Sequence, residues 1–179
     1  MGIDNSDGNN WVLVTGAASG IGCDLAQSLV EKGERVIALD RDEGKLNKVY
    51  NDSSASLVCR CLDVCDVDVA AKTVEMIREE IGMIKGLVNC AGIYPVTAFL
   101  DIAVEEWDQV MAVNAKGVFL GTKHVLGEMR KAGGGSIINI SSTLGLVGSY
   151  RSAAYTASKG AVRLLTKSTA IQYLSLIHI

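Results

Sequence analysis

Short apolar runs alternate with longer amphipathic stretches along most of the chain. The apolar runs are continuous rather than alternating, which is typical of strands buried on both faces of a parallel sheet. The runs predicted to be strands are residues 12–14, 36–39, 57–62, 85–89 and 136–140. Between them apolar residues recur at helical spacing, most clearly at Val69, Val74, Ile77 and Ile81. The segments predicted to be helices are residues 23–32, 41–50, 67–81, 104–131 and 153–172.

This alternation continues without a break in composition, which predicts one α/β domain over residues 11–173. Strands separated by helices favour a doubly wound parallel sheet of the Rossmann type. The 179 residues are 49% hydrophobic and 21% charged, as expected of a globular protein. Residues 1–10 are polar and acidic, so we expect a flexible segment there and no secretory signal.

The charge balance and the cysteines limit the partners. The net charge of −3 gives no reason to expect nucleic acid or an anionic membrane, and no apolar run approaches a membrane span. Five cysteines are an odd count, and only His124 and His178 could complete a metal site with them. We therefore expect no metal, reduced and mostly buried thiols, and a cytoplasmic location.

The most informative segment is glycine-rich and lies between the first strand and the first helix. Gly16, Gly20 and Gly22 have the spacing Gly-x-x-x-Gly-x-Gly, with Ser19 and Ile21 among them. Glycines let the backbone approach a pyrophosphate closely, and a helix N-terminus adds free N–H groups and partial positive charge. The segment therefore predicts a phosphate-binding turn.

Asp40 follows the second apolar run, eighteen residues past Gly22. A carboxylate there can accept both ribose hydroxyls of an adenine nucleotide and repel a 2′-phosphate. The residue favours NAD over NADP as cofactor, although Arg41 is an ambiguous neighbour because a cation attracts phosphate.

Other strands also end in polar or small residues. These ends are Asp63, the segment 89–92 and Ser142. Ligands of such sheets bind at the carboxyl ends of the strands, so these residues would surround one elongated ligand. Asp63, followed by Val64, is interpreted either as an adenine contact or as the N-cap of the next helix.

Tyr155 and Lys159 are four residues apart and share one face of the last predicted helix. A free phenol titrates near ~10, and a nearby ammonium favours the phenolate and lowers that pKa. Ser142, thirteen residues before Tyr155, could supply a hydroxyl to a substrate oxygen. The three residues together predict acid–base chemistry.

Taken together, these motifs resemble the classical short-chain dehydrogenase/reductase family over residues 11–173. The matching positions are Thr15, Gly16, Gly20, Gly22, Asp63, Val64, the segment 89–92, Asn114, Ser142, Tyr155 and Lys159. The resemblance implies hydride transfer between a nicotinamide and a small-molecule substrate, which is a secondary alcohol or a ketone. It also implies a homodimer or homotetramer.

The resemblance assigns roles to individual residues. Tyr155 would be the acid–base, Ser142 would orient the substrate oxygen, and Lys159 would bind ribose and lower the tyrosine pKa. Asn114 would hold a helix irregularity and a proton-relaying water. The residues expected to contact the cofactor are Gly16, Ser19, Gly20, Ile21, Gly22, Asp40, Arg41, Asp63, Val64, Asn89, Ala91, Gly92, Tyr155 and Lys159.

Two departures from the family pattern affect the expectations. Cys90 replaces the second Asn of an Asn-Asn-Ala-Gly motif, and the sole proline, Pro95, leaves no later Pro-Gly turn. We interpret residues 174–179 as a non-native tail, with the C-terminal strands missing and the fifth strand left without an outer neighbour. On that interpretation the 179 residues bind NAD weakly through its ADP moiety and do not turn over substrate.

Three functional hypotheses remain open from the sequence. The first is an NAD-dependent oxidoreductase acting on secondary alcohols or ketones. The second is a catalytically inactive nucleotide-binding fragment, which would bind cofactor without hydride transfer. The third is a 3-oxoacyl-carrier-protein reductase, which activity on acyl thioesters and a preference for NADPH would reveal.

Overall fold

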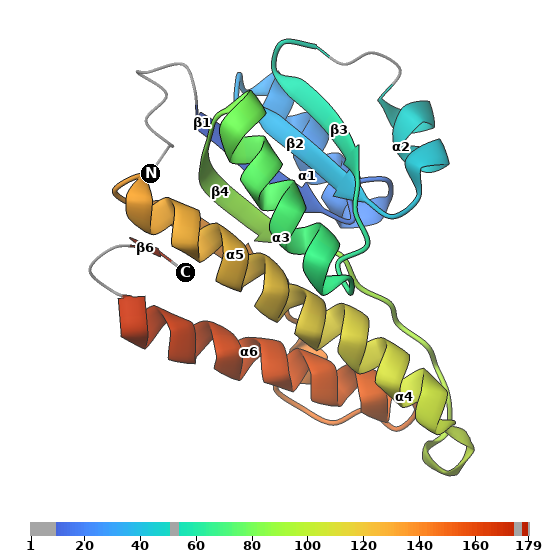
Figure 1. Cartoon of the computed structure of the whole chain (residues 1–179). Coiled ribbons are helices and arrows are strands. Elements are labelled where there is room, and N and C mark those ends of the chain that lie inside the picture. The colour runs from blue at the N-terminus through green and yellow to red at the C-terminus, as the bar shows by residue number, and fades with distance from the viewer. Residues whose placement is uncertain (1–9, 51–53, 174–176, 179) are drawn as a thin grey trace.

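The computed structural model describes residues 10–50, 54–173 and 177–178. Within them six parallel strands form one sheet in the order β3-β2-β1-β4-β5-β6 (Figure 1). The strands are β1 (Asn10–Thr15), β2 (Val36–Asp40), β3 (Leu57–Cys61), β4 (Met83–Asn89), β5 (Gly135–Asn139) and β6 (Ile177–His178). The order reverses between β1 and β4, where a doubly wound sheet opens a crevice.

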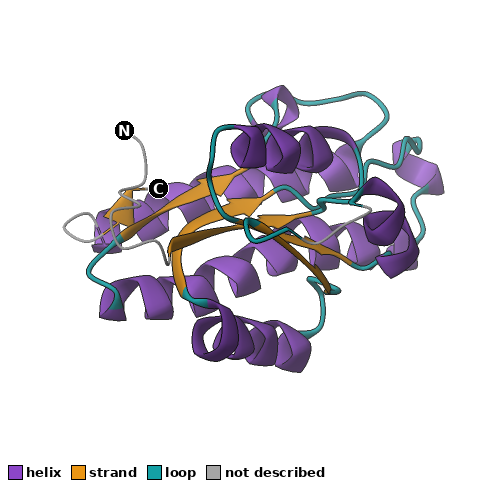
Figure 2. Ribbon diagram, turned by 90° about the horizontal axis from the view of Figure 1, so that it is seen from above, coloured by secondary structure: helices purple, strands orange, loops and turns teal. Residues whose placement is uncertain are grey.

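Helices lie on both faces of this sheet, as Figure 2 shows. The α-helices are α1 (Gly20–Glu31), α2 (Glu43–Val49), α3 (Val67–Met76), α4 (Val104–Met111), α5 (Gly117–Lys131) and α6 (Ala153–Tyr173). Short helical turns are η1 (Ile77–Ile81), η2 (Phe99–Asp101), η3 (Ala112–Lys116) and η4 (Thr143–Gly145). The predicted α/β fold of the Rossmann type is confirmed.

Alternate residues of the central strands point into two separate cores. Leu13 of β1 belongs to one cluster with Val74 of α3 and Val125 of α5. Its neighbour Val14 belongs to a second cluster with Leu46 of α2. Because both faces of β1 are buried, the strand reads as a continuous apolar run.

Helix boundaries differ from the predicted ones where local capping decides them. The helix predicted from residue 41 begins at Glu43, because the Asp42 side chain accepts a hydrogen bond from the Lys45 N–H at 2.9 Å. Arg41 therefore precedes the helix. The first helix begins at Gly20, three residues earlier than predicted, so the glycine-rich segment supplies its first turn.

The long helix predicted over residues 104–131 is interrupted by a π-helical turn. Helices α4 and α5 are joined by η3, which contains the buried Asn114. A helix irregularity at this residue is what the family resemblance predicted. The apolar pattern alone does not show it, because a single π turn changes the period only locally.

The prediction that β5 has no outer neighbour is wrong. Residues 177–178 form β6 and pair in parallel with Gly135 and Ser136. A two-residue strand carries too little periodicity to be seen in the sequence, and the open edge of β5 offers backbone groups for pairing. Residues 1–9, 174–176 and 179 lie outside the described residues, and most of the predicted flexible N-terminal segment and of the predicted non-native tail falls there.

The cysteines are free thiols, and the expectation that most are buried is wrong. Cys61 is exposed and the other four are half-buried. Two of them, Cys59 and Cys61, lie on β3 at the edge of the sheet, where burial is incomplete. Over the described ranges no group of three or more His, Cys, Asp or Glu side chains could hold a metal ion. No helix in that part of the chain is long and apolar enough to cross a membrane.

Candidate active site

The glycine-rich segment brings the end of β1 against the turn that follows β4. Gly16 has a φ of +70°, and a Cβ there would lie 2.8 Å from the Ala91 Cα. A larger residue would push the two chain segments apart. The Thr15 hydroxyl oxygen adds to this contact by accepting hydrogen bonds from the N–H groups of Cys90 and Ala91, at 3.0 and 3.2 Å.

The N-terminus of α1 faces the same place and is left uncapped. Ser19, the residue before the helix, makes no side-chain capping hydrogen bond to any described residue. The first turn also contains no acidic side chain. The first N–H groups of a helix lack partners within it, so this end can accept an anion.

Asp40 is held in place by the backbone around it. Its Oδ2 accepts a hydrogen bond from the Ala18 N–H at 3.1 Å, and its Oδ1 accepts one from the Asp42 N–H at 3.0 Å. Each carboxylate oxygen keeps a further lone pair for a ligand hydroxyl. The tertiary structure thus joins the carboxylate at the end of β2 to the glycine-rich segment.

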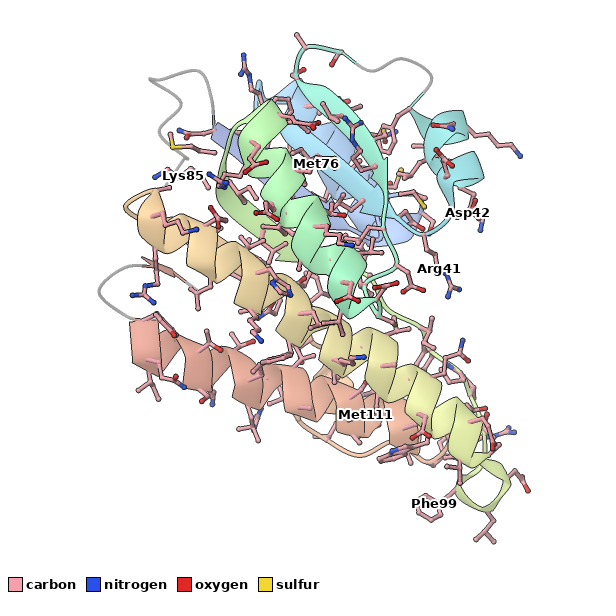
Figure 3. All side chains as sticks on the ribbon, viewed as in Figure 1. Arg41, Asp42, Met76, Lys85, Phe99 and Met111 are labelled. Carbon is pink, nitrogen blue, oxygen red and sulfur yellow. The ribbon has the colours of Figure 1, made fainter. Side chains whose placement is uncertain are left out.

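These residues line one cleft of about 410 Å³ at the carboxyl ends of the strands. The cleft contains the sequence-predicted residues Gly16, Ser19, Gly20, Ile21, Gly22, Asp40, Arg41, Asp63, Val64, Ala91 and Gly92. Cys90, part of the predicted segment 89–92, also lines it, and the lining residues that were not predicted are Ala18, Asp42, Lys45, Leu62, Ile93 and Val113. Figure 3 shows two of the lining residues, Arg41 and Asp42, between the end of β2 and α2.

Asp63 is not the cap of α3. That role belongs to Asp66, whose side chain accepts hydrogen bonds from the N–H groups of Asp68 and Val69. Asp63 instead accepts one from the Cys65 N–H at 2.9 Å, which turns its carboxylate into the loop beside the cleft. Of the two interpretations of Asp63, the structure excludes the N-cap.

Asn89 lies outside the cleft lining. It is buried, and its side-chain amide donates to the Thr122 hydroxyl at 3.3 Å and to Asn139 Oδ1 at 2.8 Å. These contacts tie β4 to α5 and β5. The geometry makes Asn89 a support for the strand end rather than a lining residue of the cleft.

Asn114 is fully buried and closes the cleft from behind. Its amide nitrogen donates to the Ile93 carbonyl at 2.9 Å and to the Ser158 hydroxyl at 3.1 Å. Its Oδ1 accepts from the Ile93 N–H at 2.8 Å. Both donors are therefore used within the protein, and one Oδ1 lone pair remains for another partner.

Lys159 lies beside Asn114 with its ammonium group buried. The Nζ atom donates to the Ile140 carbonyl at 2.7 Å, and burial lowers the pKa of the lysine from its ordinary value. A Cβ on Gly92 would lie 3.3 Å from Asn114 Oδ1 and 3.7 Å from Lys159 Nζ. The glycine thus leaves the cleft wall without a side chain where these two residues approach it.

Tyr155 lies one helical turn before Lys159, and the Lys159 Nζ is 5.6 Å from its ring centroid. Its ring also meets the Tyr94 ring edge-on, with centroids 4.5 Å apart. The Ser152 hydroxyl donates to the Tyr94 oxygen at 3.3 Å. Sequence reasoning missed Tyr94, because nothing local to residue 94 indicates a contact with α6.

Ser142 caps the short turn η4 and donates to no described residue. Its hydroxyl oxygen accepts a hydrogen bond from the Leu144 N–H at 3.1 Å. A hydroxyl that accepts in this way still has its own O–H to donate. The next residue towards the strand, Ser141, donates to the Lys159 carbonyl at 3.0 Å and so joins the end of β5 to α6.

Comparisons with known proteins agree with this geometry. The family model described as short chain dehydrogenase matches residues 10–177. A cyclopentanol dehydrogenase of Comamonas testosteroni is 39% identical over 163 residues, which cover 89% of this chain and 65% of that protein. A 3-alpha-(or 20-beta)-hydroxysteroid dehydrogenase of Mycobacterium tuberculosis is 40% identical over 162 residues, 89% of this chain and 62% of that one.

A third relative is the cis-4-hydroxycyclohexanecarboxylate dehydrogenase of Sinomonas cyclohexanicum. It is 38% identical over 164 residues, which cover 90% of this chain and 66% of the relative. The chain thus spans about 65% of the length of the curated relatives it matches. On the family match over nearly all of its described residues, the chain belongs to the short chain dehydrogenase family.

Proposed function

We propose that this chain binds NAD in the cleft and forms the cofactor-binding and catalytic part of a dehydrogenase of secondary alcohols. One observation carries the proposal. The cleft that begins at the glycine-rich segment is also lined by Gly92, where an added Cβ would lie 3.3 Å from Asn114 Oδ1 and 3.7 Å from Lys159 Nζ. The same domain, residues 11–173, would hold both the nucleotide and the proton-transfer residues.

The residues present fit a dinucleotide. The uncapped N-terminus of α1 suits the pyrophosphate, and Asp40 suits the hydroxyls of the adenosine ribose. Asp63 and Val64 offer a polar and an apolar contact to the adenine. When bound, the nicotinamide supplies the acceptor or donor of the hydride.

The choice of NAD over NADP rests on charge at the cleft rim. A 2′-phosphate would face the Asp40 carboxylate, whereas Lys45 is already paired with Asp42 at 3.1 Å. Arg41 also lines the cleft and is a neighbouring cation that could favour a phosphate. We expect NAD to bind more tightly by about 1–3 kcal/mol, the scale of a charge left facing a like charge.

The acid–base role falls to Tyr155. The buried Lys159 ammonium lies 5.6 Å from the centroid of its ring, and the phenol can exchange a proton with a substrate hydroxyl or carbonyl. Ser142 has a free O–H to orient the substrate oxygen. Asn114 holds the backbone of Ile93 in place and has one acceptor site left for a water.

The substrate class follows from the relatives and from the surface beside Tyr155. The names of the Comamonas and Sinomonas relatives specify a hydroxyl group on a ring. Tyr94, half exposed, presents an aromatic side chain next to the Tyr155 ring. We therefore extend the proposal to small alicyclic alcohols and their ketones.

Exposed apolar side chains on three helices support the proposed homodimer or homotetramer. They are Trp107 of α4, Phe119 of α5 and Leu164 of α6. Apolar side chains exposed on neighbouring helices are typical of surfaces that a partner covers. Sedimentation of the purified chain would measure the mass directly.

The test separates binding from turnover. Calorimetry with ADP and with NAD measures binding to the 179-residue chain, and absorbance of NADH measures turnover with cyclopentanol. A chimaera that continues residue 173 with the unaligned remainder of the Comamonas relative is assayed in parallel. Absence of ADP and NAD binding would exclude the cofactor site, and binding without turnover in either protein would favour the inactive nucleotide-binding fragment.

A further inference from the structure

Tyr50 follows α2 directly and reaches back to the glycine-rich segment. Tyr50 has a relative exposure of only 8% and packs in the core cluster that contains Leu46 and Val14. Its hydroxyl donates a hydrogen bond to the Ala17 carbonyl at 2.9 Å. The two residues are 33 positions apart in the chain, so only the fold brings them together.

The peptide units of Ala17 and Ala18 are held from several directions. The Ala17 N–H donates to the Leu39 carbonyl at 3.1 Å, and the Ala18 N–H donates to Asp40 Oδ2 at 3.1 Å. The Tyr50 hydroxyl holds the remaining carbonyl of Ala17. The segment is thus attached to the end of β2 on one side and to the end of α2 on the other.

The Tyr50 contact matters because Ala17 is inaccessible to water. Ala17 is fully buried, so its carbonyl cannot exchange a lost protein donor for solvent without movement of the segment. Such a movement would displace the Ala18 N–H from Asp40. Ala18, Ser19 and Asp40 all line the cleft, so the displacement would reach the nucleotide.

We propose that Tyr50 is a positioning residue for nucleotide binding, which holds the glycine-rich segment in its binding conformation through the Ala17 carbonyl. The inference rests on the proposed function of the cleft as a nucleotide site. Without the hydroxyl, the segment samples other conformations, and a nucleotide must select the competent one. Apparent affinity then falls while the ring still fills the core.

The experiment compares Tyr50→Phe with the unaltered chain. The phenylalanine keeps the buried ring and removes only the hydroxyl. We expect the Kd for ADP, measured by calorimetry on the 179-residue chain, to rise roughly three- to tenfold. Hydrogen exchange without ligand should accelerate at the amides of Ala17 and Ala18.

Two control variants separate positioning from general destabilisation. Tyr173→Phe removes another tyrosine hydroxyl, from a ring that packs on the opposite core and lies 6.0 Å from Arg130. Val74→Ala weakens that same opposite core without touching the glycine-rich segment. Both variants should leave the Kd for ADP within about twofold, because preorganisation of the segment is unchanged.

The outcomes are distinct. A Kd for Tyr50→Phe equal to that of the unaltered chain, or an equal rise in Val74→Ala, overturns the inference. If the unaltered chain binds no ADP, the proposed function fails, and the exchange rates still decide the role of Tyr50 in holding the segment. Unchanged exchange at Ala17 and Ala18 then overturns it as well.

Discussion

The two ends of the cleft are built differently. At the proposed nucleotide end, Leu39, Asp40 and Tyr50 hold the peptide units of Ala17 and Ala18 by hydrogen bonds between 2.9 and 3.1 Å. At the proposed reactive end, Tyr94, which contacts the Tyr155 ring, is 54% exposed. Buried, hydrogen-bonded backbone is preorganised, whereas exposed side chains remain free to adapt.

The proposed catalytic residues themselves form a boundary between these ends. Asn114 and Lys159 are buried and hydrogen-bonded like the nucleotide end, although they face the reactive one. Exposed apolar side chains also lie far from the nucleotide end. In Figure 3, the exposed Phe99 of η2 lies beyond the outer end of α4, well away from Arg41. Binding and turnover should therefore respond separately to substitutions.

The largest expected effect is a loss of turnover in Tyr155→Phe without a loss of NAD binding. Tyr155→Phe removes the proposed acid–base hydroxyl and should lower kcat with cyclopentanol by at least about a hundredfold. The Kd for NAD should stay within about twofold, because the phenol acts on the substrate proton. Steady-state rates give kcat, measured on whichever of the 179-residue chain and the chimaera turns over substrate, and calorimetry gives the Kd for NAD.

Lys159→Met is the matched comparison for this substitution. The lysine is proposed both to bind ribose and to hold its charge beside the phenol during proton transfer, so the change should lower kcat and weaken NAD binding together. A Tyr155→Phe protein that keeps more than a few per cent of kcat would show that another group moves the proton.

A smaller effect tests the charge at the nucleotide end. NAD should bind more tightly than NADP by about 1–3 kcal/mol, and Asp40→Ser should remove most of that preference. Arg41→Ala serves as a control, because loss of the cation should weaken NADP more than NAD. Equal dissociation constants for the two cofactors in the unaltered chain would contradict the role of Asp40.

Asn114→Ala tests whether the boundary residues stabilise the fold. The substitution removes three hydrogen bonds from a fully buried amide and leaves the Ile93 backbone unpaired there. We expect the free energy of unfolding to fall by about 1–3 kcal/mol, measured in urea. Ser142→Ala, on a partly exposed turn, should change it by less than about 1 kcal/mol. A larger loss of stability in Ser142→Ala than in Asn114→Ala would show that the end of β5 stabilises the fold more than the buried amide does.

The smallest effect concerns the pH dependence of stability. Burial, followed by the neighbouring Cys23 thiol, raises the pKa of Tyr50 above its ordinary value near 10. The unfolded chain therefore loses this proton first, so the tyrosine contributes stability that is present below pH ~10 and declines as the pH rises above it. In Tyr50→Phe the decline should be shallower by up to ~1.4 kcal/mol per pH unit. Parallel curves for the two proteins would argue against a buried, protonated phenol.

Most of the fold could be predicted because its information is local. The continuous apolar runs identify β1 to β5, and helical periodicity identifies the segments between them. The glycine spacing, Asp40 and the Tyr155–Lys159 pair are equally visible, since each is a short pattern beside a predicted strand or helix. The rule that ligands bind at the carboxyl ends of parallel strands then brings these separate patterns to one edge of the sheet.

Only the tertiary structure decided which of the polar residues face the cleft. Asp66 caps α3 and leaves Asp63 to the cleft, although both precede the helix by a few residues. Asn89 turns inward to Thr122 and Asn139. Local sequence cannot rank such alternatives, because the choice depends on which partners the fold brings within hydrogen-bond distance.

The contacts that hold the site together are the least visible in the sequence. Tyr50 meets Ala17 across 33 residues, and Asn114 meets Ser158 across 44. Periodicity and spacing report neighbours along one strand or helix, whereas these pairs come from segments that meet only after the sheet and helices pack. The sequence by itself therefore determined the architecture and the chemical groups, and packing determined how rigidly each group is held.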